Sequence, residues 1–282
     1  MNWKYVKTLL IVLLLAVNCM LGYLAYNAYS ETAFTDLSTA ESTVRVLAEG
    51  GIKVSADMLA VKNDSAKTFV GEYSREDYLL SVAAFLLGEE PNGIFLLPSG
   101  IIAEGSSGKT VLLHNDLSVH YAAADEEEQT DILPLTDEEE LKNARELFAS
   151  LLGYNKEAFG GMPVEKRGEM LLLSVSQSEG GIPLFGYDCT FGVKDGKIVF
   201  ADGKHFFGEF AEDGEAPLLN RTNILLSEKA RGSVGTVEKI ELCYVLYEDT
   251  KQDLLRLIPA YSVSYADGNT SIINALDASL FE

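Results

Sequence analysis

Two Asp-Gly pairs, Asp195-Gly196 and Asp267-Gly268, each lie between two runs rich in β-branched and aromatic residues. Such a pair fits a two-residue turn whose central residues take positive φ, and this turn joins antiparallel strands. The flanking runs are PLFGYDCTFGVKDGKIVFADGKHFF and LIPAYSVSYADGNTSIINAL, and MLLLSVSQ and VEKIELCYVLY read as further strands. Hairpin turns between the strands favour antiparallel sheets over parallel β-α-β units.

The sequence also contains patterns that mark the starts and ends of helices. Three segments begin with Ser or Thr followed three residues later by an acid, which is an N-terminal capping pattern, and each ends at glycine. With the hairpins, they predict the α+β class, with helices packed on one face of each sheet. The capping residues are Ser38, Ser74 and Thr136, the stops are Gly50, Gly88 and Gly153, and a weaker helix covers 220–231.

The N-terminal region carries a long stretch without charge. Lys4 and Lys7 precede 23 uncharged, mostly apolar residues, 8–30, and about 20 such residues span a bilayer as a helix. We therefore predict a single transmembrane anchor over 8–30, with 1–7 cytoplasmic and the rest extracytoplasmic, because both lysines precede the span. A cleaved signal peptide is the alternative, although no clean small-x-small cleavage site follows.

One face of this predicted helix combines polar and small side chains. Asn18, Gly22, Ala25 and Tyr29 recur at helical spacing, and such a face lets a second helix approach closely and form hydrogen bonds. We interpret these residues as a transmembrane contact face. The alternative is a lipid-facing helix that tolerates Asn and Gly.

The segment beyond residue 30 is strongly acidic. It holds 20 of the 22 basic residues and all 43 acidic ones, a net charge of −23, which repels nucleic acid. A run of nine acids without a base, 125–140, reads as a linker leading into an acidic first helical turn, and a divalent-cation site is the weaker reading. The linker divides this part into two predicted ectodomain modules, 31–130 and 131–282.

The segment AEGSSGKT, 103–110, resembles a loose phosphate-binding loop. Such a loop needs a strand before it and a helix after it. Here GIFLLPSGII, a strand with a Pro-Ser-Gly break, precedes it, and strand-like TVLLHNDLSVHY follows. We therefore predict a hairpin turn and no nucleotide site.

No catalytic or metal motif is visible in the sequence. The histidines His114, His120 and His205 show no metal-ligand spacing, and no Gly-x-Ser-x-Gly elbow is present, so each histidine is interpreted as an ordinary surface or strand residue. Cys189 and Cys243 could form one disulfide or stay as two buried thiols. We expect no enzyme activity, no catalytic residue, no cofactor and no metal.

The layout resembles the YycI/YycH family, single-span accessory regulators of a two-component, cell-wall-regulating sensor histidine kinase in Gram-positive bacteria. The resemblance rests on MNWK before the apolar stretch, on GIPLFGYDCTFGVKDGKIVF, and on the ending LIPAYSVSYADGNTSIINALDA. Tyr261 stands where the family would have Trp, and Asp277-Ala278 where Thr-Gly often follows. The resemblance implies binding to the kinase, usually with a paralogous single-span partner, and no catalytic residue.

Three functions follow as expectations. The first is a membrane-anchored extracytoplasmic regulator of a sensor histidine kinase that acts by protein–protein contact through span and ectodomain. The second is an extracytoplasmic wall-directed hydrolase, which would need His205 or two facing carboxylates in a deep cleft. The third is a secreted binding or inhibitor domain.

Overall fold

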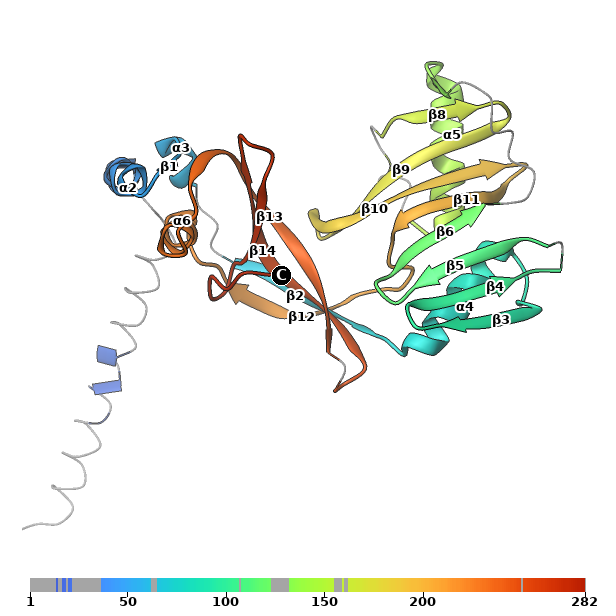
Figure 1. Ribbon diagram of the computed structural model, residues 1–282, viewed down its shortest axis with the longest axis horizontal. Coiled ribbons are helices and arrows are strands. Elements are labelled where there is room, and N and C mark those ends of the chain that lie inside the picture. Colours follow the sequence, from blue (N-terminus) through green and yellow to red (C-terminus); the bar gives the residue numbers. More distant parts are fainter. Residues whose placement is uncertain are drawn as a thin grey trace, which may run out of the picture. The chain divides into compact units, whose positions relative to one another are not determined.

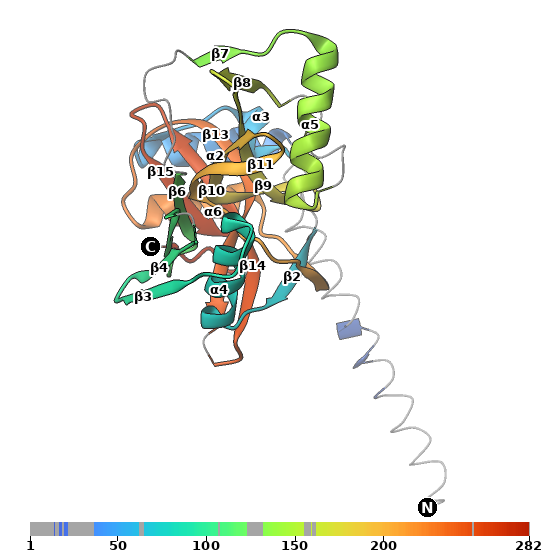
Figure 2. The same ribbon diagram turned by 90° about the vertical axis from the view of Figure 1, so that its right-hand side faces the viewer.

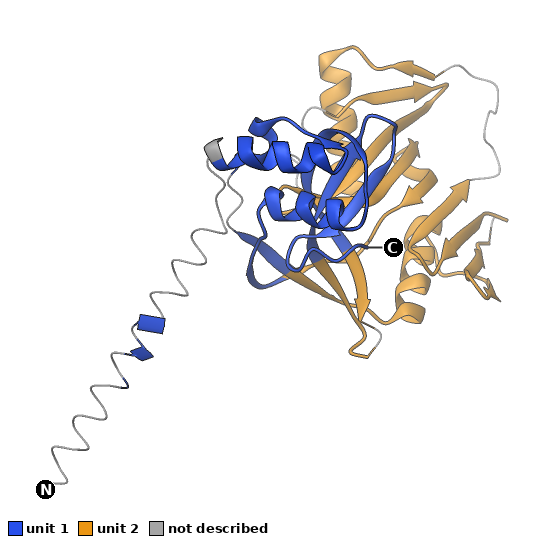
Figure 3. Cartoon of the chain, turned by 60° about the vertical axis from the view of Figure 1, so that its left-hand side comes forward, with its two compact units in different colours: residues 1–68, 212–245, 258–282 blue, residues 69–211, 246–257 orange. Residues whose placement is uncertain are grey.

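The chain forms two compact units, each built from segments that are separated in the sequence (Figure 3). Unit 1 comprises 1–68, 212–245 and 258–282, and unit 2 comprises 69–211 and 246–257. The computed structural model describes residues 14, 17–18, 20–21, 37–61, 65–106, 108–122, 132–154, 159, 162–249 and 251–281.

The predicted fold class, two modules of antiparallel sheet after a transmembrane helix, is wrong in the arrangement of the sheets and in the transmembrane helix. Instead of two separate antiparallel sheets, the strands hydrogen-bond into one 15-stranded sheet, and it is mixed because β1 (Ile52–Lys53) pairs parallel with β13 (Gly235–Asp249). Turn signals report only which neighbouring strands pair. They carry no information on the pairing of strands far apart in the sequence, such as β2 (Ser65–Glu72) with β14 (Leu254–Tyr265).

The prediction of a single-pass membrane protein is also corrected. Within the residues that the structure describes, no helix has both the length and the apolar character needed to cross a membrane. Of the predicted span 8–30, only 14, 17–18 and 20–21 are described; they are helical and exposed. The described helices therefore do not support the transmembrane helix that the apolar composition of 8–30 predicts.

From residue 37 on, the described part of unit 1 includes the short helices α2 (Leu37–Glu49), α3 (Ala56–Leu59) and α6 (Arg221–Ala230) (Figure 1). In α6, the Asn220 side chain caps the first turn by accepting a hydrogen bond from the Asn223 amide at 2.8 Å, as its place at the predicted helix start indicates. Cys243 is a free, buried thiol in this unit, as Cys189 is in unit 2. Unit 1 also contains β12 (Ala211–Pro217) and β15 (Thr270–Asn274).

Unit 2 contains a continuous antiparallel run of strands. Their order is β7-β8-β9-β10-β11-β6-β5-β4-β3, so β7 and β3 lie at its two ends (Figures 1 and 2). The strands are β3 (Gly93–Leu97), β4 (Gly100–Glu104), β5 (Thr110–His114), β6 (Ser118–Ala122), β7 (Ile132–Pro134), β8 (Val164–Arg167), β9 (Met170–Glu179), β10 (Ile182–Lys194) and β11 (Lys197–Lys204).

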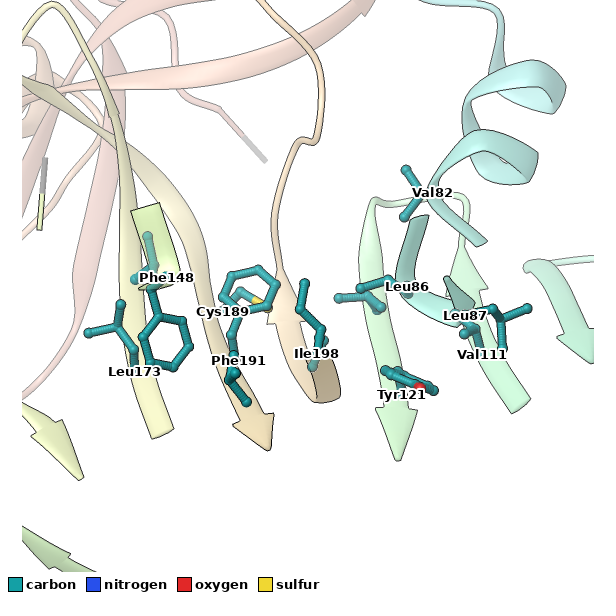
Figure 4. Close-up of a cluster of buried hydrophobic side chains, with 14 of the residues drawn as sticks. Val82, Leu86, Leu87, Val111, Tyr121, Phe148, Leu173, Cys189, Phe191 and Ile198 are labelled. Atoms are coloured by element: carbon teal, nitrogen blue, oxygen red, sulfur yellow. The ribbon is translucent and has the colours of Figure 1, made fainter. Parts of the chain in front are cut away.

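The core of unit 2 lies between these strands and two helices, α4 (Arg75–Leu87) and α5 (Glu138–Leu152). Figure 4 shows Phe148 of α5 near Leu173 of β9, while Leu87 of α4 lies near Val111 of β5. Fully burying a side chain such as Phe148 stabilises the fold by roughly 1.5–3 kcal/mol. Both helices contribute to one continuous cluster and so fix the strands between them.

The predicted hairpin turns are confirmed. Asp195 and Gly196 have φ of 52° and 70°, as the two-residue turn between β10 and β11 requires. Asp267-Gly268 also lies in a hairpin turn, between β14 and β15, but this turn is longer than two residues. Gly268 has φ of 87° whereas Asp267 does not have positive φ, and the Tyr265 amide donates to the Asn269 carbonyl. The loop-like segment 103–110 joins antiparallel β4 to β5, so the prediction of a hairpin there is also confirmed.

The start of α5 differs by one residue from the predicted capping pattern. The N-cap is Asp137, whose Oδ1 accepts hydrogen bonds from the Glu139 and Glu140 amides at 3.0 and 2.9 Å. Asp137→Ala should destabilise the fold by about 1 kcal/mol, because those donors lose their acceptor. Thr136→Ala should change the free energy of unfolding by less than about 0.5 kcal/mol, and equal effects in urea unfolding would contradict this assignment.

Candidate functional site

Unit 2 contains a cavity of about 600 Å³. Its walls come from the middle of α4, the C-terminal end of α5, the end of β9 and the segment 205–210 that follows β11. The lining residues most relevant to chemistry are Phe85, Tyr154, Glu179, His205, Phe207 and Glu209.

His205 is buried in this wall with only 2% of its surface exposed. Its Nε2 lies 3.0 Å from the Tyr154 hydroxyl, and its Nδ1 has no hydrogen-bond partner within the described part of the chain. Burial lowers the pKa of His205 to about 4, so the imidazole is neutral at neutral pH. The ring also packs edge-on against Phe191 and Phe207, with centroids 5.3 and 4.7 Å away.

Side chains from other elements fix the segment that carries His205. Gln177 of β9 donates from Nε2 to the Phe206 carbonyl at 3.0 Å and accepts from the Phe206 amide at 2.9 Å. The Tyr78 hydroxyl accepts from the Phe207 amide at 3.0 Å, and burial raises the pKa of Tyr78. These bonds satisfy backbone groups that lie outside any strand, so they hold this wall of the cavity in one conformation.

The charged groups of the cavity are acidic. Glu179 and Glu209 line it, and no Lys or Arg occurs among its lining residues, all of which the structure describes. Partial burial raises the pKa of the Glu179 carboxyl. The C-terminal end of α5 also lies in the wall, and a helix C-terminus carries a partial negative charge.

Within the described residues, His205 is not arranged as the base of a serine or cysteine nucleophile. The Tyr154 hydroxyl is the only side-chain hydrogen-bonding partner of the His205 imidazole among the described residues, and burial raises the pKa of Tyr154 to about 12. A serine or cysteine nucleophile would have to lie within hydrogen-bond reach of the base. Ser81, which also lines the cavity, instead donates to the Tyr78 carbonyl at 2.8 Å. Among the described residues, the His205–Tyr154 pair therefore lacks the base–nucleophile hydrogen bond of an acyl-transfer site.

The edge strand β3 is a second feature of unit 2. Ile94, Phe95, Leu96 and Leu97 are all exposed, with Leu96 at 78% and Phe95 at 53%. A groove of about 540 Å³ lies between β3 and α4, lined by Leu79, Leu80, Ile94, Leu96, Leu97 and Ile101 with Arg75 and Glu76. β3 has one hydrogen-bonded neighbour, β4, among the described strands.

The opposite edge strand, β7, is built differently. It has three residues, and its last is Pro134, which has no backbone N–H to offer a further strand. Natural sheets protect their edges with short strands, proline and charge. β3 has five residues without proline or charge. The two edges of one sheet thus differ in their capacity to accept another strand.

The structure separates the residues that sequence reasoning singled out. Asn18 is helical and exposed, whereas Gly22, Ala25 and Tyr29 of the predicted contact face lie outside the described residues. His120 is exposed, and its Nδ1 lies 3.0 Å from Asp202 Oδ1. His205 is neither a surface nor a strand residue, and no sequence spacing signals its contact with Tyr154.

Metal ligation finds no support in the described part of the chain. It contains no group of three or more His, Cys, Asp or Glu side chains placed to hold an ion. The acidic run 125–140 lies partly outside the described residues, which resume at 132. His114 ends β5 and does not join the cavity.

Comparison with known proteins yields structural neighbours only. No protein-family model and no curated protein sequence matches the chain. It is similar to an uncharacterized protein from Eubacterium rectale (13% identity, 86% of this chain and 98% of that one, TM-score 0.41). It is also similar to the Bacillus megaterium YpeB C-terminal domain (13% identity, 75% and 97%, TM-score 0.32).

Proposed function

We propose that this protein is a regulator that acts by binding another protein, and that β3 is its docking edge. The observation that carries the proposal is the exposed, uncharged apolar strand β3 at the end of the antiparallel run of unit 2. A free strand edge binds an extended segment through backbone hydrogen bonds, and neighbouring pockets select its side chains. The groove beside α4 provides such a pocket.

The occupant we propose is an extended apolar segment of a protein whose surrounding surface is neutral or basic. Each copy of this chain has a net charge of −21, so a second copy is repelled at long range whereas a basic partner is attracted. The resemblance to YycI/YycH names the partner class, a cell-wall sensor histidine kinase. The regulator would shift the kinase between two states by binding one of them more tightly.

Replacing Leu96 with Asp should weaken this docking strongly. A carboxylate in the centre of the edge cannot be buried against an apolar segment without a large desolvation cost. We expect complex formation with the cell-wall sensor histidine kinase of the same genome, measured by biolayer interferometry with both proteins purified, to weaken about thirtyfold or more. The side chain is exposed, so the fold should tolerate the change.

The matched control is Leu133→Asp on β7, the opposite edge, where the leucine is 63% exposed. It should leave the affinity unchanged. Equal affinities for both variants would overturn the assignment of β3. Light scattering of the same proteins tests whether the chain pairs with itself. If the unsubstituted chain and Leu133→Asp are dimers and Leu96→Asp is a monomer, the strand edge binds a second copy of this chain and not the kinase.

A wall-directed hydrolase is the second candidate, because His205, Glu179 and Glu209 line the same cavity. Its test is the release of soluble fragments from purified cell wall by the full chain and by the Glu179→Gln variant. Release that depends on Glu179 would favour the hydrolase over the non-catalytic regulator. Equal or undetectable release with both chains would count against it.

A further inference from the structure

The cavity of unit 2 has walls suited to an organic cation. Phe85, Tyr154, Phe206, Phe207 and Phe210 all line it. Phe85 is 42% exposed, and its ring lies 5.6 Å from that of Phe207 at an angle of 56°. The two rings are tilted relative to each other, and the faces of aromatic rings attract cations.

Three negative features add to these rings. Glu179 and Glu209 line the cavity, and the partial negative charge at the end of α5 is not offset by any basic residue in its last turn. Lys and Arg are missing from the lining, which consists of described residues. A bound cation would therefore meet carboxylates and a helix end without competition from a resident positive charge.

His205 contributes a neutral polar group to the same wall. Its Nδ1 is enclosed and has no partner within the described part of the chain, whereas its Nε2 is held by Tyr154. In the tautomer that donates Nε2–H to the Tyr154 hydroxyl, Nδ1 is an unused acceptor. Because Nδ1 is enclosed, His205 adds a neutral ring to this wall and no positive charge at neutral pH.

We propose that this cavity binds a small organic cation, an ammonium group on an apolar body. Its volume of about 600 Å³ lies in the range of small-molecule sites, and its aromatic walls with a few polar groups have the composition of such sites. The proposal goes beyond docking through β3 and rests on different residues. A bound ligand would place its ammonium group against the faces of Phe85 and Phe207 and near the Glu179 carboxylate.

The test uses choline and its neutral isostere 3,3-dimethyl-1-butanol, in which carbon replaces the charged nitrogen. Each is titrated into the ¹⁵N-labelled full chain, with the amides of Gly153 and Gly208 in the cavity wall as reporters. We expect saturable shifts with choline, and binding of the isostere weaker by about fivefold or more, since it lacks the cation–π and charge attraction. Equal binding of both, or no saturable binding of choline, would overturn the proposal.

Two pairs of variants locate the site. Glu179→Gln and Phe85→Leu should each weaken choline binding by about threefold or more, because one removes a charge and the other an aromatic face. Glu165→Gln on β8 and Phe185→Leu on β10 make the same changes at exposed positions outside the cavity and should leave binding unchanged. Unfolding midpoints matched to those of the unsubstituted chain exclude misfolding as the cause. If only the two control variants weaken choline binding, the assignment of the binding site to this cavity is wrong.

If the chain does not bind choline, the proposed docking through β3 is unaffected. If docking through β3 fails, the proposed cation site is likewise unaffected. Leu96 lies outside the cavity lining, so Leu96→Asp should bind choline as the unsubstituted chain does. Glu179→Gln should in turn bind the kinase normally. A chain that loses both activities in either variant would contradict the separation of the two sites.

Discussion

Lowering the pH from 7 to 4 should cost the folded chain about 3 kcal/mol of stability through one side chain, His205. Burial depresses the pKa of His205 from 6.5 to about 4 in the folded state. Between these values the unfolded chain takes up a proton that the folded chain does not, so protonation favours unfolding. This share of stability is complete above pH 6.5 and is lost as the pH falls towards 4.

The measurement is urea unfolding of the unsubstituted chain and of His205→Gln at several pH values between 7 and 4. The His205→Gln variant lacks the titrating group. Between pH 7 and 4 its free energy of unfolding should therefore fall by about 3 kcal/mol less than that of the unsubstituted chain. Its absolute stability should be lower at pH 7, because the edge-on contacts of the imidazole with Phe191 and Phe207 are lost.

His120→Gln is the matched control, since this imidazole is exposed and paired with Asp202 on the neighbouring strand. It should leave the pH dependence of the unsubstituted chain in place. Carboxylates elsewhere, such as Asp116 with its pKa held at about 2, also weaken the fold in acid, but they are common to all three proteins. Parallel profiles for the unsubstituted chain and His205→Gln would contradict a neutral buried imidazole.

Local signals predicted the parts of the fold that depend on a few consecutive residues. The Asp195-Gly196 turn and the stop at Gly153 each follow from the conformational preferences of one or two residues. The N-cap of α5 was misplaced by one position because Thr136 and Asp137 are both good capping residues. Such ambiguity changes little in the packing.

Contacts between distant residues were outside the reach of sequence reasoning. The cavity brings Tyr154 and Gln177 to the segment after β11, over separations of 51 and 29 residues. Neither Gln177 nor Tyr154 belongs to a motif, and a lone histidine in a strand-rich segment gave no signal. Pairing of strands far apart in the chain likewise leaves no local pattern, so the single mixed sheet could not be predicted.

The exposure of β3 runs against the usual meaning of its sequence. Five residues, GIFLL, without a charge normally indicate a strand buried on both faces. Four of them are exposed in the structure, where β3 ends the strand order. An apolar run at a sheet edge is a conflict between local sequence and environment, and such conflicts occur where proteins bind partners.

Replacing Glu228 with Ala should destabilise unit 1 by about 2–3 kcal/mol. Glu228 lies in α6 with 1% of its surface exposed. Its Oε1 accepts from Arg231 at 2.8 Å, and its Oε2 accepts from Ser233 at 3.0 Å and from the Tyr265 hydroxyl at 3.1 Å. The carboxylate thus joins the end of α6 to strand β14, against the unfavourable partial charge of a helix C-terminus.

The alanine leaves the Tyr265 hydroxyl without its Glu228 acceptor and removes one of the two acceptors of Arg231, which also donates to the Ala278 carbonyl. Glu228→Gln keeps an acceptor oxygen and should cost only about 1–2 kcal/mol. Glu238→Ala, at an exposed position of β13, should change stability by less than about 0.5 kcal/mol. Urea unfolding of the three variants gives the ranking. If Glu228→Ala and Glu238→Ala cost the same, the network does not stabilise unit 1, and the buried carboxylate would need another explanation in the packing of α6 against β14.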